Sequence, residues 1–171
     1  MLVALSLSGC FAQETPDATS SPSPSTTPVF ASEEEALAAA TEAYENYLKV
    51  SDAILADGGA KPERLLEVAT SAIYERELEG YAQLASAGLH GAGSSRFDST
   101  RLQQWSSVGS TTSIAFYACV DIGGTDFLDS EGNSHVPLDR VERYPAEITV
   151  ERTQDRDLVS TDSPWSGENF C

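Results

Sequence analysis

The residues of this chain best suited to chemistry are three cysteines and two histidines, namely Cys10, Cys119, Cys171, His90 and His135. They are scattered along 171 residues, so their spacing offers no cluster of metal ligands. The sequence also lacks a Gly-x-Ser-x-Gly elbow, a phosphate-binding loop and a zinc motif. We therefore predict no metal, no cofactor and no catalytic residue, and we interpret the cysteines as groups for anchoring and crosslinking.

Cys10 ends the run Leu7-Ser8-Gly9-Cys10, which resembles the bacterial lipobox, where signal peptidase cuts before a lipidated cysteine. The apolar residues 1–6 resemble a signal h-region but are too short for a bilayer span, which takes roughly 20 residues. A basic n-region is missing, which we attribute to a start codon assigned too far downstream. We interpret 1–9 as a partial lipoprotein signal peptide and predict lipidation of Cys10. The alternative is a chance match of four residues.

Residues 10–31 are predicted to be the lipidated cysteine and a disordered tether. Residues 12–31 are rich in Ser, Thr and Pro, and such a segment cannot bury enough apolar surface to offset its ordering entropy. A flexible tether of about 20 residues reaches roughly 25 Å, and a fully extended one roughly 60 Å. We therefore predict a protein held by its N-terminal lipid at the extracytoplasmic face of the cell membrane.

The charge of the chain excludes some partners. The formal net charge is −17, and Glu14 and Asp17 are the two charged residues among the first 31, so −15 falls on 32–171. Nucleic acid is excluded because phosphate binding needs clustered Lys and Arg, and adhesion of the domain itself to anionic headgroups is disfavoured. The chain has two lysines and eight arginines, a bias typical of GC-rich bacterial genomes.

Cys119 and Cys171 remain once Cys10 is assigned to the anchor. An even pair of cysteines in an exported domain favours a disulfide, and this one would fix the last residue of the chain. On the chain-entropy account it would contribute roughly 4 kcal/mol. The alternative is two free thiols.

The domain 32–171 begins with helical spacing. Ser32 followed by Glu33-Glu34-Glu35 is typical of a capping box, and apolar residues recur at helical spacing up to Leu55. Gly58-Gly59 is expected to end this helix.

Two shorter helical segments should follow. Pro62 suits the first position of a helix that reaches Ala69, and a third segment ends near Gly88. We expect a break at Thr70-Ser71, with Ser71 as its cap, and a loop over 91–95.

From residue 96 onward the spacing becomes strand-like. Strands are predicted over 97–106, 112–122 and 146–150, with a last one from Leu158 toward Trp165, separated by turns at 129–133 and 153–157. Helices followed by antiparallel strands predict the α+β class, with N-terminal helices packed on a curved antiparallel sheet.

This order of elements resembles the NTF2-like (SnoaL-like) superfamily, in particular actinobacterial lipoproteins that carry such a domain after a Ser/Thr/Pro tether. The resemblance covers about 32–171. It rests on the helix through Tyr44, the Thr70-Ser71 break, the strand 116–121 and the Pro164-Trp165 ending with Cys171. The resemblance implies a cone-shaped fold with a pocket between helices and sheet. Its members include dehydratases, isomerases and non-catalytic domains, so the fold alone assigns no activity.

Enzymes of this superfamily use Asp/His or Asp/Tyr pairs inside the pocket. Alternation turns Ile114 and Val120 toward the helices and Asp121 to the opposite face, so Asp121 is a poor catalytic candidate. We place His90 at a helix exit and His135 in a solvated turn. Asp126, Asp129, Ser130 and Glu131 form an acidic turn without the spacing of a calcium loop.

Six aromatic residues could line an apolar pocket or simply form the core: Tyr44, Tyr47, Tyr74, Tyr81, Trp105 and Phe116. We therefore hypothesise a non-catalytic, membrane-anchored domain that binds a small apolar ligand or an envelope protein. The alternatives are a small-pocket enzyme of the dehydratase or isomerase type and a purely structural envelope component. An inward Asp/His or Asp/Tyr pair within hydrogen-bonding distance would favour the enzyme.

Overall fold

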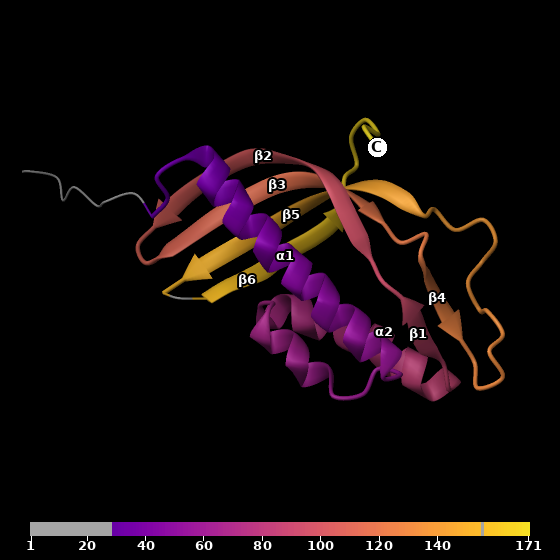
Figure 1. The fold of residues 1–171 in the computed structure, drawn as a ribbon. Coiled ribbons are helices and arrows are strands. Elements are labelled where there is room, and N and C mark those ends of the chain that lie inside the picture. The colour runs from indigo at the N-terminus through magenta and orange to yellow at the C-terminus, as the bar shows by residue number, and fades with distance from the viewer. Residues whose placement is uncertain (1–28, 155) are drawn as a thin grey trace, which may run out of the picture.

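The computed structural model describes residues 29–154 and 156–171 and has the α+β architecture expected from the sequence (Figure 1). Residues 1–28, which hold the predicted signal peptide, Cys10 and most of the predicted tether, lie outside the described residues. Within the described part of the chain, no helix has both the length and the apolar character needed to cross a bilayer.

Three helical segments come first: α1 (Glu33–Ala56), the 3-10 helix η1 (Pro62–Glu67) and α2 (Ser71–Ala87). Six strands follow: β1 (His90–Gly93), β2 (Arg96–Val108), β3 (Thr111–Asp121), β4 (Thr125–Leu128), β5 (Arg143–Thr153) and β6 (Arg156–Pro164). The order β2-β3-β5-β6 forms an antiparallel sheet, and β1 pairs with β4 in a second sheet. Helix α1 crosses one face of the curved larger sheet (Figure 1).

Both ends of α1 follow the sequence signals. The Ser32 side chain accepts the Glu35 N–H, and Glu35 Oε2 accepts the Ala31 N–H at 2.6 Å, which closes the predicted capping box one residue earlier than usual. Gly58 and Gly59 end the helix with positive φ. Gly59 also lies against α2, since a Cβ there would stand 2.4 Å from the Tyr81 carbonyl oxygen.

The core lies between the helices and the inner face of the larger sheet. Ala36, Ala40 and Ala43 are buried, and their small side chains let α1 approach the sheet closely. The inner face is built by the predicted alternating apolar positions of β3 and β5, to which β6 adds Val159: Ile114, Phe116, Ala118, Val120, Ala146, Ile148, Val150 and Val159. Alternation was therefore a sound guide for β3 and β5.

The C-terminal tail covers part of the outer face. Cys119 and Cys171 form the predicted disulfide, with a Cα–Cα distance of 5.6 Å. Under the tail, Tyr117 makes edge contacts with Trp165 at 4.9 Å and Phe170 at 6.2 Å between ring centroids. The last residues of the chain are thus held against β3.

Three local predictions are wrong. The segment 91–95, expected as a loop, contributes to β1, which pairs with an unpredicted β4 because the glycine-rich stretch after β3 turns back antiparallel. The second helix ends at Glu67. The cap of α2 is Thr70 and not Ser71, since hydrogen bonds to Val159 fix the backbone at Val68 and Thr70.

Candidate functional site

The six aromatic residues for which a pocket and a core role were both open belong to the core or pack against it. Tyr44, Tyr47, Tyr81 and Phe116 are buried within the core cluster, and Tyr74 and Trp105 pack against it. Tyr44 packs edge-on against Phe116 with ring centroids 6.0 Å apart. The four grooves found on the described part of the surface are lined by other residues, apart from Tyr81.

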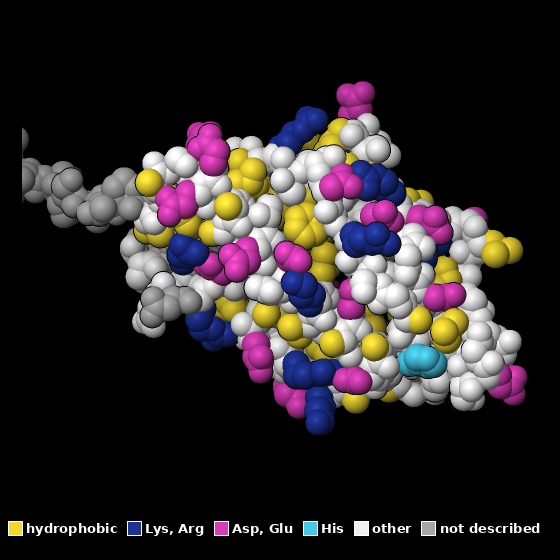
Figure 2. Space-filling model, in the orientation of Figure 1, with side chains coloured by type: hydrophobic (Ala, Val, Ile, Leu, Met, Phe, Trp, Pro, Cys, Tyr) yellow, Lys and Arg dark blue, Asp and Glu magenta, His cyan; other side chains and the backbone are white. Residues whose placement is uncertain are grey.

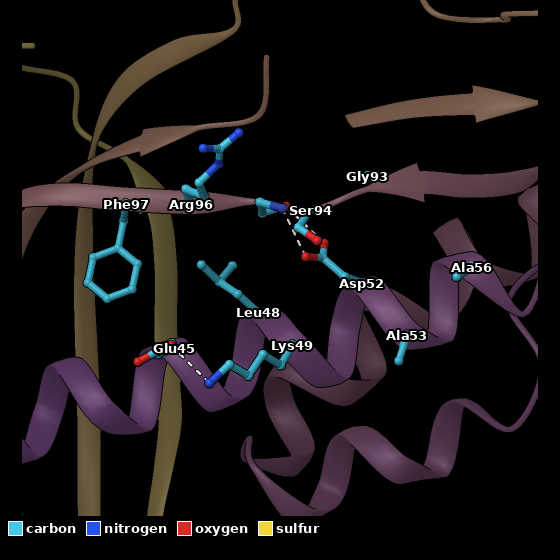
Figure 3. Close-up of a pocket in the computed structure, with 11 residues that line it drawn as sticks. Glu45, Leu48, Lys49, Asp52, Ala53, Ala56, Gly93, Ser94, Arg96 and Phe97 are labelled. Carbon is cyan, nitrogen blue, oxygen red and sulfur yellow. Dashed lines mark hydrogen bonds and ion pairs between the residues drawn. The ribbon is translucent and has the colours of Figure 1, made fainter. Parts of the chain in front are cut away.

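The largest of these four, groove A, encloses about 630 Å³ between the C-terminal half of α1 and the segment from β1 into β2 (Figure 3). Leu48 and Phe97 project into it from opposite sides, and Ala53 and Ala56 extend the apolar floor along α1 (Figure 3). The whole run 93–97 borders the groove. Helix α1 forms the opposite wall of groove A, because its lining residues, such as Glu45, Leu48 and Asp52, are three or four positions apart and so share one face of the helix.

Charged groups at the rim of groove A are engaged with neighbours. Lys49 Nζ lies 2.9 Å from Glu45 Oε1. Asp52 accepts the backbone N–H and the hydroxyl of Ser95, each at 2.9 Å, and so ties α1 to the start of β2. Arg96 points away from α1 (Figure 3). Groove A therefore offers an apolar floor with a polar rim, and the space-filling view shows exposed hydrophobic side chains between acidic and basic ones (Figure 2).

Groove B encloses about 500 Å³ between α2, the end of α1 and β4. Its lining is mostly apolar and includes Leu84, Leu89 and Phe127, while Glu77 and His135 supply the charged and titratable groups. Like groove A, it lies at the C-terminal half of α1, on the side away from residue 29.

A Tyr-Asp pair lies between α1 and β6. The Tyr44 hydroxyl donates to Asp162 Oδ2 at 3.3 Å, and Arg76 Nη1 donates to the Asp162 carbonyl oxygen at 3.0 Å. Burial raises the pKa of the Asp162 carboxyl to about 6, although Arg76 and the Tyr44 hydrogen bond act in the opposite direction. Burial and the nearby carboxylate also raise the pKa of Tyr44 and Tyr47.

The Asp162 carboxyl can take up or release a proton near neutral pH, whereas the Tyr44 hydroxyl, whose pKa is raised, keeps its proton there. A carboxyl with a pKa close to the working pH suits general acid or base chemistry. Perturbed pKa values gather at functional sites, though buried structural pairs show them too. Asp162 is partly buried and Tyr44 is fully buried, and neither belongs to the lining of groove A or B.

Asp162 was not found from the sequence because of a β-bulge. Simple alternation from the buried Val159 would turn Asp162 to the outer face. The register of β5 and β6 shifts between Thr149 and Val150, so Asp162 stands opposite Ile148, which faces the helices. Such a shift carries no sequence signal here, because Ser160 and Thr161 are ordinary strand residues.

The other predicted polar positions are structural in character. His90 begins β1 opposite Leu128 and not at the helix exit, because Gly88 already ends α2. Asp121 accepts the Gly123 N–H at 2.9 Å. Among residues 29–154 and 156–171, no three His, Cys, Asp or Glu side chains gather as metal ligands.

In the acidic turn, Asp129 is the hydrogen-bond acceptor at the centre. It accepts bonds from the Asn133 side chain, the Asn133 and Glu131 N–H groups, and His135 Nε2 at 3.1 Å. These bonds, led by those from Asn133, hold the pKa of Asp129 well below its usual range. The carboxylate thus organises its own loop.

Comparisons with known proteins add only the fold. No protein-family model matches the chain, and no curated protein matches it. Among solved structures, the intermembrane space region of the chloroplast protein ARC6 is similar, with a TM-score of 0.54 and 12% identity over 77% of this chain and 97% of that one. At this identity the likeness concerns the arrangement of helices and strands and not the activity.

Proposed function

We propose that this protein is a lipid-anchored, extracytoplasmic domain that binds a small apolar ligand or an envelope protein without catalysis. The anchor is the lipidated Cys10, and the tether up to Ala31 enters the domain at the N-terminus of α1. The cone-shaped, NTF2-like arrangement of the domain is part of this proposal. Its support is the order of helices before strands and the curvature of the sheet around α1 (Figure 1).

The main support for the proposed binding function is groove A. Binding sites for small molecules are concave, mostly apolar and equipped with a few polar groups. Leu48 and Phe97 supply the apolar contact, and the rim carboxylates of Glu45 and Asp52 are already bonded to Lys49 and Ser95. Groups engaged in this way suit recognition at a rim better than proton transfer.

Site-specific crosslinking tests the binding function. A photoreactive residue is placed at Lys49, on the rim of groove A, and separately at Lys61, which borders none of the four grooves. The tethered protein is irradiated in its own envelope, and the mass of its adducts is measured. We expect an adduct from position 49 that position 61 does not give and that Phe97→Ala weakens. Equal labelling at both positions, or none, would argue against a ligand in groove A.

The anchor has a separate test. With the full upstream signal restored, Cys10→Ala should move the protein from the membrane fraction to the soluble extracytoplasmic fraction, because the thioether to the lipid cannot form. Retention of the variant in the membrane fraction would refute lipidation at Cys10.

A second candidate, a small-pocket enzyme of the dehydratase or isomerase type, is favoured by the Tyr44–Asp162 pair alone. In that case Asp162 would act as the base, with its hydrogen bond from Tyr44 holding the carboxylate in place. Turnover of a carbonyl or hydroxy substrate should then disappear in Asp162→Asn while far-UV circular dichroism is unchanged. Full activity in that variant would dismiss the pair as catalytic.

A further inference from the structure

Groove A lies between a helix and a sheet edge. Strand β2 has β3 as its neighbour on one side only, and β1 pairs with β4 alone, so the run 93–97 from β1 into β2 has a free edge. Alternate backbone N–H and C=O groups of an edge strand point away from its sheet. Among the described residues, the Ser95 N–H makes the one backbone hydrogen bond of 93–97 that lies outside the two ladders. The free edge at 93–97 can therefore pair with an added strand.

The groove has the length of a short extended chain. The run 93–97 lies alongside the C-terminal half of α1, with Gly93 toward Ala56 and Phe97 toward Glu45 (Figure 3). The α1 wall from Glu45 to Ala56 covers eleven steps of about 1.5 Å, or roughly 16 Å. Five extended residues at about 3.3 Å each cover the same length. A strand added beside 93–97 would therefore follow α1 from one end of groove A to the other.

The floor of groove A can receive the side chains of such a strand. Ala53 and Ala56 are exposed on α1, and the Phe97 ring projects toward α1 but stays only half-buried. Successive side chains of a strand point to opposite faces, so every second side chain of an added strand would cover this apolar floor. The bonds from Ser95 to the Asp52 carboxylate hold the free edge beside α1, which means that both walls are in place before binding.

We propose that groove A binds an extended, apolar segment of another protein, which adds a strand at 93–97 and places alternate side chains on α1. The inference rests on the proposed binding function of groove A and narrows its ligand to a polypeptide. The free edge selects a polypeptide over a purely apolar molecule, because a chain with its own alternating N–H and C=O groups satisfies those of the edge. The net charge of −17 disfavours a second copy and acidic segments, so the bound segment is neutral or basic.

The N-terminal segment of this chain enters the domain at the other end of β2. Phe30 packs on Trp105, in the last part of β2, with ring centroids 5.8 Å apart. The register of β2 against β3 is regular up to Asp98, and its bulges come later in the strand. The free edge at 93–97 is therefore a regular stretch, away from the point where the chain enters.

Peptide selection tests the proposal. The full chain, purified in detergent, is the target for a phage-displayed library of random heptapeptides. We expect enriched sequences in which apolar residues alternate and Lys or Arg replaces Asp or Glu. The enriched peptide is then synthesised with two analogues, each N-methylated on one of the two alternate sets of residues. One analogue should bind at least about tenfold more weakly, because it lacks the N–H groups that face the free edge, and the other should bind nearly as before.

A matched pair of variants and hydrogen exchange locate the bound peptide. Ala53→Gln fills the floor of groove A, and Ala82→Gln makes the same change at an exposed position of α2 that borders none of the four grooves. The first variant should bind the peptide about tenfold more weakly, and the second should bind it like the wild type. Peptide addition should slow the exchange of backbone amides in 93–97 and leave those of 102–108 unchanged.

Four results would each overturn the proposal: no enriched sequence, equal binding of the two analogues, equal binding by the two variants, or no slowing of exchange in 93–97. The last is expected if the chain's own N-terminal segment fills the groove. The binding function of groove A survives any of them if a residue at position 49 still crosslinks to a small molecule. Loss of that adduct as well would refute both the peptide and the binding function.

Discussion

Loss of the Cys119–Cys171 disulfide should lower the free energy of unfolding by about 4 kcal/mol. The two cysteines are 52 residues apart in the sequence, and on the chain-entropy account a closed loop of this size restricts the unfolded chain by about that amount. The folded state itself should change little, because Trp165 also holds the tail. Its backbone N–H donates to the Pro145 carbonyl at 2.8 Å, and its ring packs on Tyr117.

Urea unfolding of Cys171→Ser and the oxidised wild type measures this difference directly. Residue 171 is exposed, so the serine leaves no cavity and the variant isolates the crosslink. Adding a thiol reductant should reduce the stability of the wild type to that of the variant and leave the variant unchanged. A difference below about 1 kcal/mol would refute the reasoning, because it would mean that the crosslink hardly restricts the unfolded chain.

Three further changes test other parts of the structure. The pKa of Asp162 is raised from about 3.8 to about 6 on folding, so its contribution to stability is present below pH 4 and is lost as the pH rises through 6. Relative to Asp162→Asn, the wild type should therefore lose up to about 3 kcal/mol between pH 4 and pH 7 in denaturant titrations; parallel pH profiles would contradict the burial of this carboxyl. Gly59→Ala should lower the free energy of unfolding by more than about 2 kcal/mol in thermal unfolding, since the new Cβ meets the Tyr81 carbonyl. Gly88→Ala, where φ is similar but the space is open, should lower it by only about 1 kcal/mol. Ser32→Ala should lower the free energy of unfolding by about 1 kcal/mol, because α1 loses its N-cap. A variant as stable as the wild type would show that the cap is dispensable.

Local signals predicted the parts of the fold that depend on neighbouring residues. The Ser32 cap, the glycines after α1 and the alternation along β3 each act over a few positions, so the sequence was sufficient to place them. The disulfide was predicted for a different reason, since only one pairing remained after Cys10 was assigned. In contrast, β1 and β4 are defined by pairing with one another, and their glycine-rich segments carry no strand signal of their own.

The candidate site was less predictable because it depends on register. Asp162 reaches Tyr44 only because the β5–β6 register shifts by one residue, and a shift of one residue exchanges the two faces of a strand. Groove A is likewise lined by positions such as Leu48, which belongs to the core cluster, and Phe97, which packs against it. The alternation of apolar residues identified the buried face of the sheet correctly. It could not show which of the inward-facing side chains are fully packed by the helices and which border a groove.

Groove A lies far from the point where the predicted tether would join the domain. Helix α1 has 24 residues and is about 36 Å long, and Ala31 precedes the N-cap of this helix. Groove A uses the C-terminal half of α1 and the start of β2. If the proposed anchor holds the N-terminus of the domain at a membrane, groove A lies at the other end of α1, and the anchor takes no part in forming it. Crosslinking from Lys49 should accordingly persist in Cys10→Ala, and its loss there would show that ligand capture requires the anchor.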